Sequence, residues 1–247
     1  MQERVVDIET SDGVMNTYIY HPDRPGPFPV VVMYMDSIGV REELADMCRR
    51  IATVGYYVVM PNLYYRRYRS VDIDPTRITD PAYDEKFRML WSLIDGLTNS
   101  MVTRDTESLF AFLDRDPIAR PGPLAIIGYC MSGPFVFRLA GAYPNRVAAA
   151  ASMYGVHLIT DKPDSPHLLA GDIKGEMYFA CAEHDKYISA TEINAVKDLL
   201  AEKKVRGGVE VYSEAEHGFA FPARRAYRKA SCERHWEQLF DLFQRNL

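Results

Sequence analysis

The feature that most constrains the fold is a repeated alternation of short apolar runs with longer segments of helical periodicity. The runs at 30–35 (VVVMYM), 56–61 (YYVVMP) and 124–130 (LAIIGYC) are typical of strands buried on both faces of a sheet. Segments with helical spacing follow at 42–55 and 132–143. Strands that are connected by helices pair with one another in parallel. The pattern therefore predicts an α/β fold whose mostly parallel central sheet is flanked by helices on both faces.

The rest of the chain fits the same plan. Residues 4–20 are expected to form a hairpin, because two alternating runs flank Ser11-Asp12-Gly13. Further elements are expected as helix over 84–116 with an interruption near 96–100, strands within 147–155 and 175–185, a helix over 190–204, a strand running into a loop over 209–219, and a long helix over 224–246. Residues 62–83 lack a regular pattern, which is typical of a lid, a binding loop or disorder. No repeat or linker interrupts the chain, so residues 1–247 are interpreted as a single domain.

Composition excludes several classes of protein. The 247 residues are 47% hydrophobic and 26% charged, as in ordinary soluble proteins, and the net charge of −5 gives no reason to expect nucleic acid or an anionic membrane as partner. No apolar run reaches the length of about 18 residues that a membrane span requires, so a cytoplasmic protein is expected. The four cysteines form no C-x-x-C pair and the six histidines no H-E-x-x-H motif, so neither disulfides nor a metal is expected.

The stretch IIGYCMSGPF (126–135) raises the question of what Cys130 does. Small residues stand two positions either side of it, at Gly128 and Ser132, between an apparent strand and an apparent helix. This spacing is typical of a nucleophile elbow, a turn too tight for larger side chains. A thiol at a helix N-terminus is favoured as thiolate, and the N–H of Met131 could then bind an oxyanion. The alternative is a buried, inert thiol, which is the commoner role of a lone cysteine.

A thiolate needs a base, and the base needs a carboxylate that orients it. Behind a nucleophile elbow the chain order is nucleophile, acid and histidine, and Cys130, Asp185 and His217 follow that order at the ends of three expected strands. Glu183 is a rival to Asp185 as the acid. His184 follows the wrong strand to be the base and is interpreted as structural or pocket-lining.

With these residues in place, the chain resembles the dienelactone hydrolase family, the cysteine-using branch of the α/β-hydrolases, over nearly its whole length. The similarity rests on residues 30–66, GYCMSG (128–133), SMYGV (152–156), CAEHDKYIS (181–189) and EAEHGFAFP (214–222). The resemblance implies an α/β-hydrolase fold. It also implies a carboxymethylenebutenolidase-like enzyme that opens lactones or cleaves esters through an acyl-thiol intermediate, without a cofactor.

The resemblance also implies roles for the segment after the first buried strand. The family places an acid there, usually Glu, that helps to activate the thiol, and Asp36 occupies this position. The next backbone amide, that of Ser37, corresponds to the second oxyanion donor. The two arginines that hold the substrate carboxylate in dienelactone hydrolase are replaced by Phe221 and Asp84. We therefore expect a natural substrate other than dienelactone, and an acid that lacks the family's arginine partner.

An aromatic pocket is expected in place of these arginines. The substrate-binding candidates are Tyr64, Trp91, Tyr154, Phe219 and Phe221, and core packing is the alternative for each. Four arginines of the expected loop, Arg66, Arg67, Arg69 and Arg77, could supply another anion anchor or be solvated surface. The expected partner is a small ester or lactone, and the apolar faces of the last helix fit a monomer core or a homodimer equally well.

Two other functions remain open at this point. One is a catalytically silent binding protein that keeps the fold without the chemistry. The other is a redox-sensing thiol, which would need a resolving cysteine such as Cys181 within reach.

Overall fold

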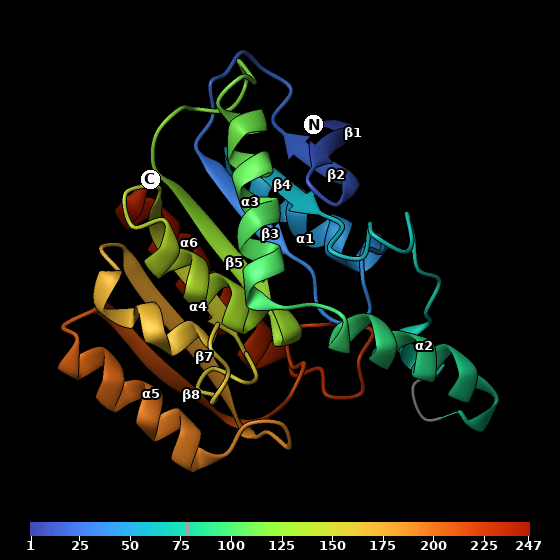
Figure 1. The fold of residues 1–247 in the computed structure, drawn as a ribbon, viewed down its shortest axis with the longest axis vertical. Helices are drawn as coiled ribbons and strands as arrows, with labels where there is room; N and C mark the ends of the chain where they lie inside the picture. Colours follow the sequence, from blue (N-terminus) through green and yellow to red (C-terminus); the bar gives the residue numbers. More distant parts are fainter. Residues whose placement is uncertain (78–79) are drawn as a thin grey trace. The chain divides into compact units, whose positions relative to one another are not determined.

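The computed structural model describes residues 1–77 and 80–247; residues 78–79, inside the expected loop at 62–83, lie outside the described part. The chain forms two compact units, Met1–Gly122 and Pro123–Leu247 (Figure 1). The interpretation of residues 1–247 as a single domain stays a prediction.

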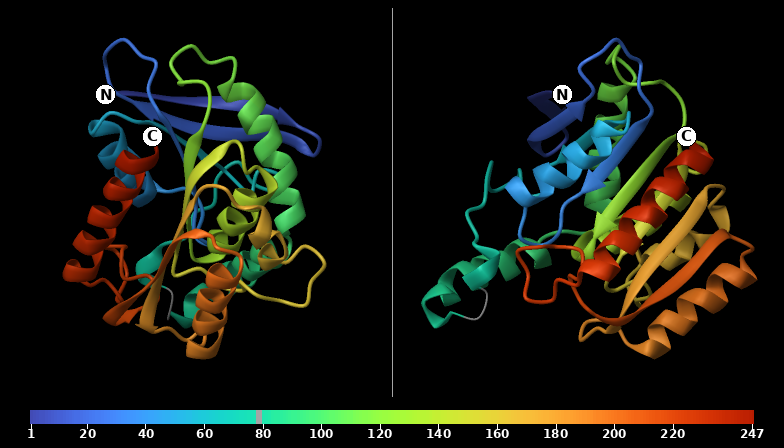
Figure 2. Two further views of the ribbon diagram at one scale, coloured as in Figure 1. Left: turned by 90° about the vertical axis from the view of Figure 1, so that its left-hand side faces the viewer. Right: turned by 180° about the vertical axis from the view of Figure 1, so that it is seen from behind.

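The first unit is built on four strands in the order β1-β2-β4-β3. Its elements are β1 (Gln2–Thr10), β2 (Gly13–His21), β3 (Val30–Tyr34), α1 (Glu42–Thr53), β4 (Tyr57–Pro61), the short 3-10 turns η1 (Pro75–Arg77) and η2 (Pro81–Tyr83), α2 (Asp84–Asp95) and α3 (Asn99–Leu113). The expected hairpin is confirmed, since β1 and β2 pair antiparallel, whereas β3 and β4 pair in parallel. Within this unit α1 and α3 cover opposite faces of the strands (Figure 2).

Local chemistry explains the boundaries of these helices. Helix α1 is followed by Gly55, whose φ of 114° is a left-handed conformation that favours glycine. The expected break near 96–100 is confirmed: α3 starts after Thr98, whose side chain accepts a hydrogen bond from the amide of Met101.

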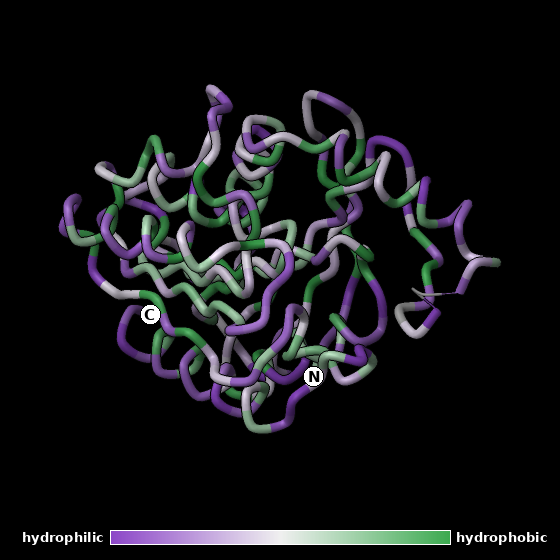
Figure 3. The backbone as a smooth tube through the Cα atoms, turned by 90° about the horizontal axis from the view of Figure 1, so that it is seen from below, coloured by the Kyte–Doolittle hydropathy of each residue, from purple (hydrophilic) through white to green (hydrophobic). Residues whose placement is uncertain are grey.

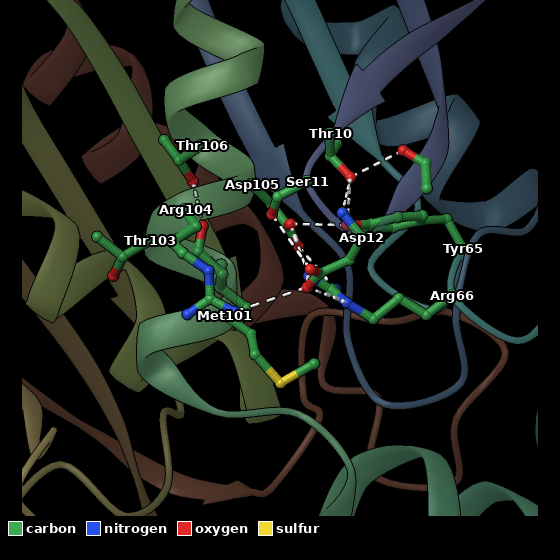
Figure 4. A network of polar contacts seen from close by, with 12 residues as sticks. Thr10, Ser11, Asp12, Tyr65, Arg66, Met101, Thr103, Arg104, Asp105 and Thr106 are labelled. Carbon is green, nitrogen blue, oxygen red and sulfur yellow. Dashed lines mark hydrogen bonds and ion pairs between the residues drawn. The ribbon is translucent and has the colours of Figure 1, made fainter.

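A polar network fixes the segment that follows β4 (Figure 4). The carboxylate of Asp105, buried on α3, accepts two hydrogen bonds from Arg66, at 2.9 and 2.7 Å, and one from the hydroxyl of Tyr65 at 2.8 Å. Arg66 also pairs with Asp12 in the β1–β2 turn at 2.7 Å. Arg66 is thus a structural residue, neither the open anion anchor nor the solvated side chain that the sequence left as alternatives.

The second unit is built on four parallel strands in the order β5-β6-β7-β8. Its elements are β5 (Leu124–Tyr129), η3 (Cys130–Ser132), α4 (Gly133–Ala142), β6 (Val147–Met153), η4 (Pro166–Asp172), β7 (Glu176–His184), α5 (Ala190–Glu202), β8 (Arg206–Glu216) and α6 (Lys229–Asn246). Helices α4 and α5 lie on one face of the strands and α6 on the other (Figures 1 and 2). The predicted α/β class with parallel strands and helices on both faces is therefore confirmed.

Two boundaries differ from the expectation. Strand β8 begins at Arg206 rather than 209 and includes Gly207, where a Cβ would come within 1.8 Å of the carbonyl oxygen of Met177. Helix α6 begins at Lys229 rather than 224, because the preceding residues fold into turns in which the amide of Arg228 donates to the carbonyl of Phe219 at 3.1 Å. The core of each unit is formed by its strands and by the inward faces of its helices, such as Ile51 on α1 and Leu239 on α6. Figure 3 shows how hydrophobic and hydrophilic stretches alternate along the backbone.

Candidate active site

The turn around Cys130 has the backbone of a nucleophile elbow. Cys130 directly follows β5, is half-buried, and has a φ of 53°, a conformation that costs a non-glycine residue about 1–3 kcal/mol. A Cβ on Gly128 would lie 2.3 Å from the carbonyl oxygen of Ser132, and one on Gly133 would lie 2.3 Å from the Cα of Gly155. The turn is therefore too tight for a side chain at Gly128, as the sequence spacing predicted. The second small position that the spacing named is Ser132, so the close contact at the adjacent Gly133 is a further constraint.

Helical structure begins at the cysteine itself. Cys130 opens η3, which continues directly into the ten-residue helix α4. The backbone amides of such a helix start point away from the helix and carry the positive end of its dipole. Met131, the next residue, is buried in this turn. Its role as oxyanion donor stays a prediction.

The structure brings His217 and Asp185 together. Nδ1 of His217 lies 2.8 Å from Oδ2 of Asp185, whose side chain is fully buried. The other carboxylate oxygen, Oδ1, accepts a hydrogen bond from the backbone amide of Tyr187 at 2.9 Å. Both oxygens are held, so the carboxylate has a fixed orientation toward the imidazole.

The rival residues lie elsewhere. The carboxylate of Glu183 accepts hydrogen bonds from the amide of Glu214 at 2.6 Å and the hydroxyl of Ser213 at 3.3 Å. It therefore binds the neighbouring strand rather than His217. His184 is exposed, and its Nε2 lies 3.9 Å from Glu183. Asp185 is thus the carboxylate that contacts the candidate base.

The surroundings of His217 favour its protonated form. Its side chain is only 13% exposed, and this burial lowers the pKa, but the charge and hydrogen bonding of Cys130 and Asp185 outweigh it and raise the pKa of His217 to about 9. Nε2 is buried and makes no hydrogen bond of regular geometry within the described part of the chain. Cys130 therefore acts on the pKa of His217 chiefly through its charge.

Aromatic rings enclose this imidazole. The ring of Tyr154 lies 5.1 Å from that of His217 at 65°, and Tyr154 in turn packs on Phe219 at 5.1 Å and on Phe221 at 6.0 Å. These three candidates are almost fully buried, so they form the wall behind the base. That they bind substrate stays a prediction. Sequence reasoning missed Tyr187, whose ring lies 4.7 Å from that of His217.

The burial of Cys181 bears on the alternative of a redox-sensing thiol. Cys181 is buried on β7, and this burial raises the pKa of its thiol to about 12. A thiol of this kind is protonated at neutral pH and reacts slowly. It is therefore a poor resolving partner for an oxidised Cys130.

The candidates of the first unit form a cluster of their own. The carboxylate of Asp36 is fully buried and receives hydrogen bonds from the guanidinium of Arg41 at 2.6 and 3.2 Å. The hydroxyl of Tyr64 donates to the carbonyl of Ser37 at 2.6 Å, while the amide of Ile38 donates to Asp36 at 3.2 Å. The peptide that links Ser37 to Ile38 is thus held at both its oxygen and its nitrogen.

Two features of this cluster and its surroundings were not expected. The sequence predicted that Asp36 lacks the family's arginine, yet Arg41, only five residues further on, forms a two-pronged ion pair with it. Trp91 lies on α2 with 52% of its surface exposed, and does not belong to this cluster. The roles of Asp36, Ser37, Tyr64 and Trp91 in catalysis or binding stay predictions.

Within 1–77 and 80–247, no three His, Cys, Asp or Glu side chains are grouped so that they could hold a metal ion. In the same part of the chain no helix combines the length and the apolar character that crossing a membrane requires.

Parallel strands, a strained cysteine between strand and helix, and an Asp–His pair after two later strands are the features of an α/β-hydrolase. Comparison with known proteins agrees. The profile of the dienelactone hydrolase family matches residues 15–247, and the chain belongs to that family. The family and the relatives that match this chain support a hydrolase that resembles carboxymethylenebutenolidase.

Individual relatives support this assignment. A candidate carboxymethylenebutenolidase of Methylorubrum extorquens is 28% identical over 242 residues, which cover 96% of this chain and 79% of the relative. A candidate carboxymethylenebutenolidase of Synechocystis is 26% identical over 93% of this chain and 91% of the relative. The crystal structure of a candidate dienelactone hydrolase from Klebsiella pneumoniae has the same fold, with a TM-score of 0.84 at 24% identity, covering 98% of both chains.

Proposed function

We propose that this hydrolase cleaves a carboxylic ester or lactone, other than dienelactone, through a Cys130–His217–Asp185 triad and an acyl-thiol intermediate. The observation that carries the proposal is the strained backbone of Cys130 at the end of β5 combined with the 2.8 Å bond between His217 and Asp185. Strain at a single cysteine beside a buried, oriented imidazole has no role in packing, whereas it suits nucleophilic catalysis.

The reaction proceeds in two halves. His217 takes the proton of the Cys130 thiol, and the resulting imidazolium stabilises the thiolate as it attacks the substrate carbonyl. The backbone amide of Met131 binds the oxyanion; a second donor, the amide of Ser37, is inferred from the family resemblance. His217 then gives its proton to the leaving oxygen, and the thioester remains on Cys130.

Water completes the cycle. His217, now neutral, takes a proton from water, which attacks the thioester and releases the acid, and the proton passes back to the sulfur of Cys130 or remains on His217. Asp185 keeps the imidazole in one orientation through both halves. Esters and lactones suit this scheme better than amides, because a tetrahedral intermediate expels a thiolate more readily than an amine.

The side chains of the second unit support a substrate other than dienelactone. Phe221 stands where dienelactone hydrolase has an arginine for the substrate carboxylate. It is almost fully buried against Tyr129, with ring centroids 5.3 Å apart. An apolar ring cannot replace a guanidinium as partner of a carboxylate.

Burst kinetics with p-nitrophenyl acetate test the proposal. The wild type is expected to release one equivalent of p-nitrophenol rapidly and to carry an acetyl group on Cys130, detected by mass spectrometry. Cys130→Ala should keep its circular dichroism spectrum and lose both the burst and the adduct. A variant that retains full turnover, or an acetyl group at another residue, would rule the mechanism out.

A further inference from the structure

The exposed tyrosine beside the candidate base contacts two members of the triad at once. The backbone amide of Tyr187 donates to Oδ1 of Asp185 at 2.9 Å, and its ring lies 4.7 Å from the ring of His217 at an angle of 70°. Tyr187 is 45% exposed, so its ring is not needed to fill the core. Within residues 1–77 and 80–247, the ring of Tyr187 contacts the ring of His217 and, in a cation–π contact, the ammonium group of Lys186.

We propose that Tyr187 is a positioning residue, whose ring confines the imidazole of His217 against Tyr154 so that Nε2 stays directed at Cys130. This inference rests on the proposed function of the triad.

The geometry supports this role because, among the residues that the structure describes, the imidazole has only one hydrogen bond, between Nδ1 and Asp185. A single hydrogen bond fixes one atom of a ring and leaves rotation about that bond open. Tyr154 closes one side of the imidazole at 5.1 Å, and Tyr187 lies against it at 4.7 Å. Tilted aromatic contacts of this kind are favourable beyond the area they bury. Together they oppose rotation of the imidazole about its bond to Asp185.

The two contributions of Tyr187 can be separated. Its amide bond to Asp185 belongs to the backbone and survives replacement of the side chain, whereas the ring contact does not. Tyr187→Ala therefore removes only the ring that contacts the imidazole of His217. Tyr187→Phe keeps this ring contact and removes the hydroxyl. Because the side chain is exposed, neither change should affect folding.

The charges around His217 give the role a second readout. The groups that face its ring are Cys130 after β5, Tyr154 after β6, and Asp185 and Tyr187 after β7, with Lys186 lying 5.1 Å from the Tyr187 ring. The pKa of His217 stands at about 9 because Cys130 and Asp185 outweigh burial. Both interactions need a fixed ring, so loosening it weakens both and moves the pKa of His217 down, whereas a Tyr187 that merely covered the imidazole would, when removed, relieve burial and move that pKa up.

Steady-state kinetics and a histidine titration by NMR test the proposal, with the His217 signal assigned by its loss in His217→Asn. Tyr187→Ala should lower kcat about tenfold, within the range that misplaced catalytic groups produce. It should leave KM within twofold and lower the pKa of His217. Tyr187→Phe should match the wild type, as should Leu168→Ala, a control that removes an exposed apolar side chain on η4.

Three results would overturn the inference. The first is an unchanged kcat and an unchanged pKa of His217 in Tyr187→Ala. The second is a rise in KM alone in that variant, which would make Tyr187 a substrate contact. The third is an equal fall in kcat in Tyr187→Phe, which would give the role to the hydroxyl. The titration needs no substrate. A wild type without a burst would therefore refute the proposed function, while the pKa of His217 would still report on Tyr187.

Discussion

Replacing Asp185 with Asn tests the core of the candidate triad. In the wild type the buried carboxylate accepts hydrogen bonds at both oxygens, from the amide of Tyr187 and from Nδ1 of His217. Asn keeps the size of the side chain and one acceptor, but presents an NH2 group where Oδ2 stood. That group cannot accept from Nδ1–H, so the imidazole loses its orienting bond or adopts the other tautomer, which places a proton on Nε2.

The size of the effect follows from the lost bond. A hydrogen bond to a charged group contributes about 1.5–3 kcal/mol. Because about 1.4 kcal/mol corresponds to a factor of ten, kcat should fall by about 10-fold to 150-fold. The same energy lowers the pKa of His217 from about 9 to about 7–8.

This shift has a consequence for stability. A histidine whose pKa is raised on folding stabilises the protein fully below its unfolded pKa of about 6.5 and loses that contribution as the pH rises through the folded value. The free energy of unfolding of the wild type should therefore decline between pH 6.5 and about 9, where His217 titrates, and Asp185→Asn should decline less. Chemical denaturation across this range measures both slopes.

The sequence itself supplies the matched control. Glu183, two residues earlier, binds the amide of Glu214 instead of His217, and Gln keeps an acceptor for that amide. Glu183→Gln should therefore retain kcat within twofold and leave the pKa of His217 unchanged. If Glu183→Gln lost as much activity as Asp185→Asn, or if Asp185→Asn kept wild-type kcat and pKa, the assignment of Asp185 would be wrong.

Two further predictions concern the elbow and the first unit. Gly128→Ala should lower the free energy of unfolding by more than about 2 kcal/mol, because its Cβ would lie 2.3 Å from a backbone oxygen. Gly208→Ala is the control, because a Cβ there meets nothing within 4 Å, and it should lower the free energy of unfolding much less. Thermal unfolding of both variants measures the difference. Tyr64→Phe removes the hydroxyl that donates to the carbonyl of Ser37 and should lower stability by about 1 kcal/mol. A fall in kcat at constant KM would show that Tyr64 orients this loop, while a rise in KM would favour the substrate contact that the sequence suggested.

The strands and the elbow could be predicted from sequence because each depends on local composition. A strand buried on both faces must be apolar throughout, as VVVMY in β3 is. An elbow must have small residues at fixed distances from its nucleophile, and Gly128 meets that requirement whatever the rest of the chain does. These constraints act over a few residues, so they are visible in the sequence.

Ion pairs and ring contacts were harder to predict because they depend on how the backbone turns. Asp36 meets Arg41 across a loop that contains Gly39, whose φ is 91°. Arg66 meets Asp105, which lies 39 residues further along the chain. An arginine in a sequence shows its charge but not the direction of its side chain. The ring of Tyr187 is similar, because its contact with His217 depends on the turn after β7.

The pairing of Asp185 with His217 depends on an irregularity that no pattern in the sequence revealed. Strands β7 and β8 run in parallel, with Glu176 beside Arg206 and Ala182 beside Tyr212, but His184 lies beside Glu216. Strand β8 therefore carries two extra residues before its end, in a bulge.

The bulge decides which residues meet. In a regular ladder Asp185 would follow in line with Ala215, a side chain that cannot act as a base. The two extra residues bring His217 level with Asp185 instead, so that the 2.8 Å bond between them forms where both strands end. Glu214 lies in this bulge with a φ of 55°, and its amide is bound by Glu183. A strained backbone conformation persists only where its surroundings hold it, and here it sets the register of the candidate catalytic pair.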